Sequence, residues 1–276
     1  LLVAFGSRLG RQQTGFAWEK FLPIGKIVQI DIDSSELEKG QPEITLGICG
    51  DASAYLKEAT ERLATNPHDW SVWRGAVAKI RSTLMSWTEN RPPSAPYVEP
   101  FQFLRSLSQS FRGDDLLVPC SSGGAFTASM QVVHPKDDQR MITNKGLASM
   151  GYGLAGGIGA AEGTSSRVFV FEGDGGFLQN VQELATVAER NYNLKIFLFS
   201  NDGYASIRMT QANYFAGRVV GSSAASGLRM PDWKLVAEAF GVGFSVIDCD
   251  WEESRAVRER LENPGPWIFE VLLDPE

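Results

Sequence analysis

Two short apolar runs separated by a helical pattern dominate the middle of the chain. Residues 167–172 (RVFVFE) and 194–200 (LKIFLFS) are rich in β-branched and aromatic side chains, as buried parallel strands are. Between them, residues 178–190 repeat apolar side chains at helical spacing. A right-handed crossover through that helix brings both strands out in the same direction. The pattern predicts an α/β fold built on a doubly wound parallel sheet.

Similar runs near the start of the chain predict a smaller α/β unit. Strands are expected at residues 1–5, 26–33 and 43–48, followed by a closing helix at residues 52–64. Together they predict part of a Rossmann-like domain over residues 1–64. Because the chain opens on an apolar strand without methionine, we expect a shortened form or a proteolytic remnant that starts inside this domain.

Residues 65–100 are predicted to form a linker and residues 101–276 the main domain. The last elements expected in the main domain are a strand at residues 240–248, a helix at 252–262 and a strand at 267–273. The linker contains an amphipathic helix with Trp70, Trp73 and Trp87. Such aromatic residues can form a ligand platform, but their helical spacing favours a core that docks the domains together.

Composition narrows the class of protein. The chain has 276 residues, 43% of them hydrophobic and 21% charged, which is typical of a globular protein. A net charge of −7 argues against nonspecific nucleic-acid binding, and no apolar run is long enough for a membrane helix. Three scattered cysteines predict buried thiols in a reducing cytoplasm and no zinc site.

Polar residues follow both of the central strands. Asp174, between two glycines, comes directly after the first strand, and Asn201 follows the second, two residues before Gly203. Because parallel strands end at one edge of a sheet, where open α/β folds bind ligands, these residues are expected to lie close together. A carboxylate, an amide oxygen and a backbone carbonyl suit a hard cation such as Mg²⁺. Either motif alone would be an ordinary turn.

The two motifs resemble the thiamine diphosphate signature of the acetolactate synthase and pyruvate decarboxylase superfamily. Residues 144–159 (NKGLASMGYGLAGGIG) resemble that family's segment before a Gly- and Ala-rich helix, and residues 29–37 with 50–52 resemble the end of its middle domain. The resemblance covers the whole chain and is most specific between residues 117 and 215. It implies the family's thiamine diphosphate-binding fold for residues 101–276 and the C-terminal part of its middle domain for residues 1–64.

The resemblance also implies roles for individual residues. Asp174 and Asn201 would bind Mg²⁺ by their side chains and Gly203 by its carbonyl. Met150 would be the apolar wedge that bends the cofactor, although a methionine is more often a core gap-filler. Gly175 and Gly176 would donate N–H groups to the diphosphate. The remaining cofactor-binding residues would be Ser121, Ser122, Gly123, Gly173, Tyr204 and Ile207; without the resemblance, residues 121–124 would read as a flexible loop.

The resemblance implies decarboxylation of a 2-oxo acid and transfer of the resulting carbanion to an acceptor. Acetohydroxyacid synthases carry a Gln-Trp-Glu pattern where this chain has residues 210–212 (TQA), so an acetolactate synthase-like carboligase is expected rather than a strict acetolactate synthase. Tyr204, Arg208 and Gln211 predict a polar pocket suited to a hydroxylated or sugar-like acceptor. Alternatively, Arg208 forms a salt bridge.

Thiamine catalysis in this family also needs a glutamate from a separate N-terminal domain, usually of a partner subunit. No residue of the chain matches it, since Glu162, Glu172 and Glu183 read as surface, strand-end and helix-face residues. We therefore expect residues 1–276 alone to be inactive and the parent to be a homo-oligomer with the cofactor between subunits. The loop at residues 6–9 partly resembles a flavin contact, but Gly10 and Arg11 replace the acidic pair, and FAD is not predicted.

Two other classes of protein stay open. One is a nucleotide- or NAD-binding module that uses the strand end at residues 31–33. The other is a noncatalytic paralogue, although such a protein has no reason to keep a buried, unpaired carboxylate at Asp174.

Overall fold

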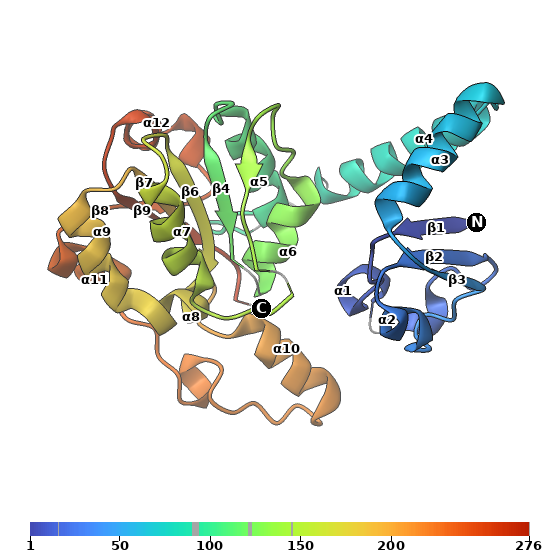
Figure 1. Ribbon diagram of the computed structural model, residues 1–276. Coiled ribbons are helices and arrows are strands. Elements are labelled where there is room, and N and C mark those ends of the chain that lie inside the picture. The colour runs from blue at the N-terminus through green and yellow to red at the C-terminus, as the bar shows by residue number, and fades with distance from the viewer. Residues whose placement is uncertain (16, 90–93, 121–122, 145, 276) are drawn as a thin grey trace. The chain divides into compact units, whose positions relative to one another are not determined.

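The apolar runs form two parallel sheets in a computed structural model that describes residues 1–15, 17–89, 94–120, 123–144 and 146–275 (Figure 1). The chain divides into two units, Leu1–Ile80 and Arg81–Glu276. The predicted α/β class with parallel sheets is confirmed. None of the described helices is both long enough and apolar enough to cross a membrane.

The first unit contains a three-stranded parallel sheet in the order β1-β2-β3. Strand β2 is shorter than the predicted range of residues 26–33, because Asp33 leaves the sheet to accept the N–H of Ser35 and cap the next helix. The elements of this unit are β1 (Leu2–Phe5), α1 (Arg11–Thr14), η1 (Trp18–Lys20), β2 (Ile27–Asp31), α2 (Ser34–Glu38), β3 (Leu46–Cys49) and α3 (Ala52–Thr65), and α4 (Ser71–Glu89) crosses into the second unit.

The docking core expected around Trp70, Trp73 and Trp87, which lie in α4 or directly before it, stays a prediction. Trp70 and Trp73 are 54% and 66% exposed, and the side chain of Trp87 lies outside the described residues. Helical periodicity predicts an apolar face, but it does not supply the element that covers it.

The second unit contains a six-stranded sheet in the order β5-β4-β6-β7-β9-β8, with every pair parallel. Helices cover both of its faces, as a doubly wound fold requires. The strands are β4 (Leu116–Pro119), β5 (Arg140–Met141), β6 (Val168–Gly173), β7 (Leu194–Ser200), β8 (Gly243–Ile247) and β9 (Trp267–Leu272). The helices are α5 (Pro100–Gln109), α6 (Gly123–Val132), α7 (Tyr152–Glu162), α8 (Asp174–Phe177), η2 (Leu178–Glu183), α9 (Leu184–Arg190), α10 (Ala205–Tyr214), η3 (Ala224–Ser226), α11 (Trp233–Phe240), η4 (Trp251–Glu253) and α12 (Arg255–Glu262).

The alternation along β6 explains why both faces are apolar. Phe169 and Phe171 face the helices α5, α6 and α12, where their rings pack with those of Phe197 and Phe111. Val168 and Val170, which alternate with the two phenylalanines, face α7, α9 and α11. A strand buried on both faces reads as a continuous apolar run, as predicted.

Two predicted elements differ from the structure. The helix expected at residues 178–190 is broken at Asn180, whose backbone is non-helical (φ −131°, ψ 26°) and whose side-chain amide donates to the carbonyl of Gly151 at 3.0 Å. The strand expected at residues 240–248 starts only at Gly243, because Phe240 still belongs to α11 and Gly241 (φ 71°) caps that helix. In the first case a hydrogen bond to a distant segment overrides the apolar pattern, and in the second a glycine cap does.

A buried ion pair closes the amino end of the large sheet. The guanidinium of Arg167 donates to both carboxylate oxygens of Asp115, at 2.9 and 2.7 Å, and to Glu262 at 2.9 Å. The ammonium of Lys195 donates to the carbonyls of Asn263 and Gly265 at 2.6 and 2.8 Å. These contacts satisfy charged groups that the packed layers bury.

Candidate functional site

The two polar turns meet at the carboxyl end of the large sheet. Strands β6 and β7 pair in register through Gly173 opposite Phe199. One carboxylate oxygen of Asp174 (Oδ2) accepts the backbone N–H of Asn201 at 3.1 Å and that of Gly203 at 2.9 Å. Its other oxygen (Oδ1) accepts the N–H of Gly175 at 2.7 Å. A single side chain therefore ties together the two segments that the motifs identified.

The carboxylate of Asp174 is 1% exposed. Burial raises its pKa above the usual value, and the N–H groups of Gly203, Gly175 and Asn201 oppose that rise. A buried carboxylate at the edge of a cavity suits a cation. Within the described ranges no group of three or more His, Cys, Asp or Glu side chains converges, so the ligands available for a cation here would be one carboxylate together with amide and carbonyl oxygens.

The turn after β7 has an unusual backbone. Asp202 and Gly203 both have positive φ angles, of 61° and 102°. A Cβ atom at Gly203 would lie 3.0 Å from Leu228 and 3.2 Å from the carbonyl oxygen of Ser222. Only glycine combines a positive φ angle with the lack of a Cβ atom, which explains why residue 203 is a glycine.

A cavity of about 240 Å³ adjoins the two turns, and it is lined by Asp174, Asn201 and Gly203. The other predicted site residues that line it are Gly123, Met150, Gly173, Gly175, Gly176, Tyr204 and Ile207. The structure therefore brings these residues together. Ser121 and Ser122 lie outside the described residues.

Gly175 and Met150 have particular environments. A Cβ atom at Gly175 would lie 2.4 Å from the ring of Tyr204, so glycine lets the turn pack against that ring. The N–H of Gly175 donates to Asp174, and a bond from it to a diphosphate would have to replace or share that contact. Met150 is 45% exposed at the cavity, which excludes the alternative of a core gap-filler.

Glu172 is a site residue that the sequence reasoning missed. It is buried, it lines the same cavity, and its Oε2 accepts the N–H of Gly153 at 2.7 Å. Burial raises its pKa to about 7. The only signal in the sequence is its place two residues before Asp174 at the end of an apolar strand.

Arg208 and Gln211 do not form the predicted polar acceptor pocket. Arg208 donates to backbone carbonyls at distances of 2.8 to 2.9 Å, and no salt bridge to it is found among the described residues. Gln211 donates to the carbonyl of Val220 and accepts the hydroxyl of Ser222. Both side chains are used to hold the surrounding backbone, and neither lines the cavity.

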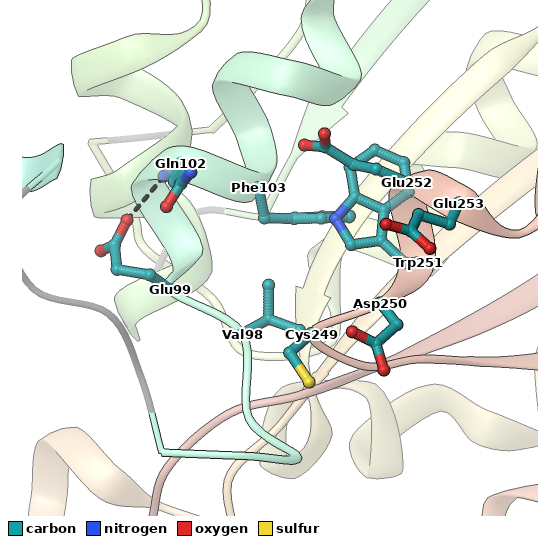
Figure 2. A pocket seen from close by; sticks show the side chains of 9 residues that line it. All are labelled: Val98, Glu99, Gln102, Phe103, Cys249, Asp250, Trp251, Glu252 and Glu253. Carbon is teal, nitrogen blue, oxygen red and sulfur yellow. Dashed lines mark hydrogen bonds between the residues drawn. The ribbon is translucent and has the colours of Figure 1, made fainter.

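The strand end proposed for a nucleotide also has local partners. Asp31 accepts the N–H of Asp33, and Asp33 caps α2. A second hollow of about 270 Å³ in the larger unit is lined by Glu99, Asp250, Glu252 and Glu253 beside Trp251 (Figure 2). Such an acidic lining repels a diphosphate. An anionic cofactor therefore fits the cavity at Asp174 better than either of these places.

A doubly wound sheet with a glycine-rich turn, a buried carboxylate and an amide-bearing turn at its carboxyl edge defines a domain that binds a phosphorylated cofactor. The family described as "Thiamine pyrophosphate enzyme, C-terminal TPP binding domain" matches residues 122–271. The chain belongs to this family, and its cofactor is thiamine diphosphate.

The chain is also similar to acetolactate synthases. It is 30% identical to "Acetolactate synthase 2, chloroplastic" of Nicotiana tabacum over 99% of the chain and 42% of the relative. It is 29% identical to "Acetolactate synthase isozyme 2 large subunit" of Escherichia coli (strain K12) over 99% of the chain and 48% of the relative. The chain therefore spans less than half the length of these relatives.

Proposed function

We propose that the chain forms the diphosphate-binding half of a Mg²⁺–thiamine diphosphate site. The observation that carries this proposal is the bonding of one Asp174 oxygen to the N–H groups of both Asn201 and Gly203. Because Asn201 and Gly203 also line the cavity at Asp174, the Asn201 amide oxygen and the Gly203 carbonyl are the other oxygen donors that we propose for the cation. Bound thiamine diphosphate supplies a carbanion that adds to the carbonyl of a 2-oxo acid.

The residues of the chain would then have separate tasks. Asp174, Asn201 and Gly203 hold the cation, and the glycines after Asp174 let the diphosphate approach the backbone. Met150, which also lines the cavity, would be the apolar contact that supports the bend of the cofactor. Glu172 accepts the N–H of Gly153 and thereby fixes the start of α7.

The cavity is small for a complete cofactor site. Its volume of about 240 Å³ is below the roughly 300–1,000 Å³ that ligand pockets usually have. This supports a half-site that another domain or subunit completes. We accordingly propose that residues 1–276 by themselves bind the diphosphate end without turnover, and that the parent is a homo-oligomer with the cofactor between subunits.

For the parent we propose a 2-oxo acid decarboxylase or carboligase similar to acetolactate synthase. The named relatives support the class of reaction. Residues 210–212 (TQA) support an acceptor different from that of the strict acetolactate synthases. Because Arg208 and Gln211 bind backbone groups, the reason for a hydroxylated acceptor no longer holds.

We keep two further proposals. The domains are assigned to residues 1–64, 65–100 and 101–276, and the change between the two units falls inside the middle range. The three scattered cysteines, none of them in a disulfide, favour the cytoplasm.

Titration calorimetry tests the proposed site. Thiamine diphosphate is expected to bind only when Mg²⁺ is present, and inorganic pyrophosphate is expected to compete with it. NAD, the ligand of the alternative nucleotide-binding module, is not expected to bind. Binding of NAD, or binding of thiamine diphosphate that ignores Mg²⁺, would contradict the proposal.

A further inference from the structure

Arg208, on α10, makes an unusual set of contacts with the backbone. Its Nη1 donates to the carbonyl oxygens of Asp202 and Ser222 at 2.8 and 2.9 Å. Its Nη2 donates to those of Asn201 and Pro275 at 2.8 and 2.9 Å. One guanidinium thus joins three segments: the turn after β7, the loop at Ser222 and the segment after β9.

The turn that Arg208 contacts requires such support. Asp202 is a non-glycine residue at φ 61°, and Gly203 follows at φ 102°. A left-handed backbone is less favourable for a residue with a side chain than for glycine, although Asp adopts it more readily than most residues. The same turn presents the N–H groups of Asn201 and Gly203 to Asp174 on one side and the carbonyls of Asn201 and Asp202 to Arg208 on the other. The turn is therefore held between an anion and a cation.

The planar shape of the guanidinium suits this task. Its five N–H donors point outward in a fixed fork, whereas a lysine ammonium has only three donors on a flexible stem. The carbonyl of Ser222, which Arg208 binds, also accepts the N–H of Tyr204, the residue that immediately precedes α10. Through these contacts, α10, the loop at Ser222 and the Asn201–Gly203 turn are all bonded to one another.

We infer that Arg208 is a positioning residue that holds the Asn201–Gly203 turn in the conformation required to bind a divalent cation. This inference deepens the proposed function and rests on it for the identity of the cation. The role of Arg208 in the shape of the turn does not depend on any bound ligand.

Hydrogen exchange in the metal-free protein tests that role. Arg208→Ala is expected to raise the exchange rates of the Asn201 and Gly203 amides at least about tenfold, while amides in the middle of β6 and β7 change less than about twofold. A merely structural role would raise exchange throughout the sheet. Equal protection of the turn in variant and wild type, or a uniform rise across the sheet, would overturn the inference.

A matched control lies one turn along the same helix. Gln211→Ala removes the contacts with Val220 and Ser222 but none with the carbonyls of residues 201 and 202. It is expected to raise exchange at Val220 and to leave the amides of Asn201 and Gly203 unchanged. If Gln211→Ala loosened the turn as much as Arg208→Ala did, the assignment to Arg208 would be wrong.

Binding of Mg²⁺ with inorganic pyrophosphate gives the second readout. Arg208→Ala is expected to weaken it at least about tenfold, a typical loss when the support of a metal ligand is removed. If the wild type bound no Mg²⁺ at all, the proposed function would fail, but the exchange measurement would still decide the role of Arg208. If Arg208→Ala does not fold, hydrogen exchange and Mg²⁺ binding are measured on Arg208→Lys, which keeps the charge. If Arg208→Lys behaved like the wild type in both measurements, the guanidinium fork would not be needed and that part of the inference would be overturned.

Discussion

The two ends of the six-stranded sheet both bury charged side chains, but they satisfy them in different ways. At the amino end, Arg167 and Asp115 neutralise each other through two short contacts, and Lys195 donates to two carbonyls. At the carboxyl end, Asp174 and Glu172 accept backbone N–H groups, and both line a cavity.

This difference separates a structural from a functional use of buried charge. In an ion pair that is complete within the chain, each charge compensates the burial of the other, and no ligand is needed. Asp174 and Glu172 keep a raised pKa because the cost of burying each carboxylate exceeds what its hydrogen bonds return, so the protein has not compensated their burial in full. Such groups are typical of sites that bind or process a ligand.

Breaking the ion pair at the amino end is expected to have the largest effect on stability. Arg167→Met should lower the free energy of unfolding by about 3–5 kcal/mol, because Asp115 is left charged and unpaired in the interior. Urea unfolding measures this loss. The control is Arg255→Met, whose contact with Glu259 is exposed and should contribute less than about 1 kcal/mol. If Arg167→Met lowered the free energy of unfolding by less than about 1 kcal/mol, the buried pair would behave like an exposed one, and the proposed difference between the two ends of the sheet would be wrong.

At the carboxyl end, substitution should affect binding more than stability. Asp174→Asn is expected to weaken Mg²⁺-dependent binding of thiamine diphosphate by roughly 100-fold or more, equivalent to about 2.7 kcal/mol. The loss of stability should be smaller than the loss of binding, because a neutral amide relieves the burial of charge although its nitrogen cannot accept a backbone N–H as the carboxylate oxygen did. Calorimetric titration measures the affinity.

Asp202→Asn is the matched control for that experiment. It removes the same charge from an exposed side chain in the neighbouring turn, and asparagine also accepts the left-handed backbone. Its affinity should change by less than about threefold, as expected for an exposed charge. If Asp174→Asn and Asp202→Asn lost the same affinity, the net charge of the turns would determine binding, and Asp174 would not be a ligand of the cation.

The pH dependence of stability should be the next largest effect. The pKa of Glu172 is raised from 4.5 to about 7, so the folded protein keeps a proton that the unfolded chain has released between these values. The free energy of unfolding should therefore fall as pH rises from 4.5 to 7, with a slope of at most about 1.4 kcal/mol per pH unit. Glu172→Gln should remove this fall while keeping an acceptor for Gly153. Parallel pH profiles of unfolding for the two proteins would contradict the prediction.

Lys195 should give the smallest effect, with the opposite sign. Burial lowers its pKa from 10.5 to about 8, so between these values the folded protein has released a proton that the unfolded chain retains. The free energy of unfolding should rise with pH across this window, by less than about 1 kcal/mol per pH unit, since two carbonyls also favour the charged form. Lys195→Met should lose the rise when unfolding is followed from pH 7.5 to 10.5. A rise that survives in Lys195→Met would assign it to another group.

Several features could be read from the sequence because they depend on neighbours along the chain. The runs at residues 167–172 and 194–200 predicted β6 and β7, and their succession in the chain predicted that the residues after them share one edge. The periodicity of a helix does not encode what covers its apolar face, so the docking core expected around Trp70, Trp73 and Trp87 stays a prediction. The break at Asn180 was missed for a similar reason, since its partner Gly151 is 29 residues away.

The amino-acid sequence by itself determined the class of fold, the two polar turns and, through their motifs, the cofactor family. Only the tertiary structure decided how the charges are used. In the structure Arg167 pairs with Asp115, and Glu172 is buried beside the cavity. Arg208 donates to backbone carbonyls and does not line a substrate pocket. The physical reason is that burial and hydrogen-bonding partners depend on segments far apart in the chain, which meet only when the helices pack on the sheet.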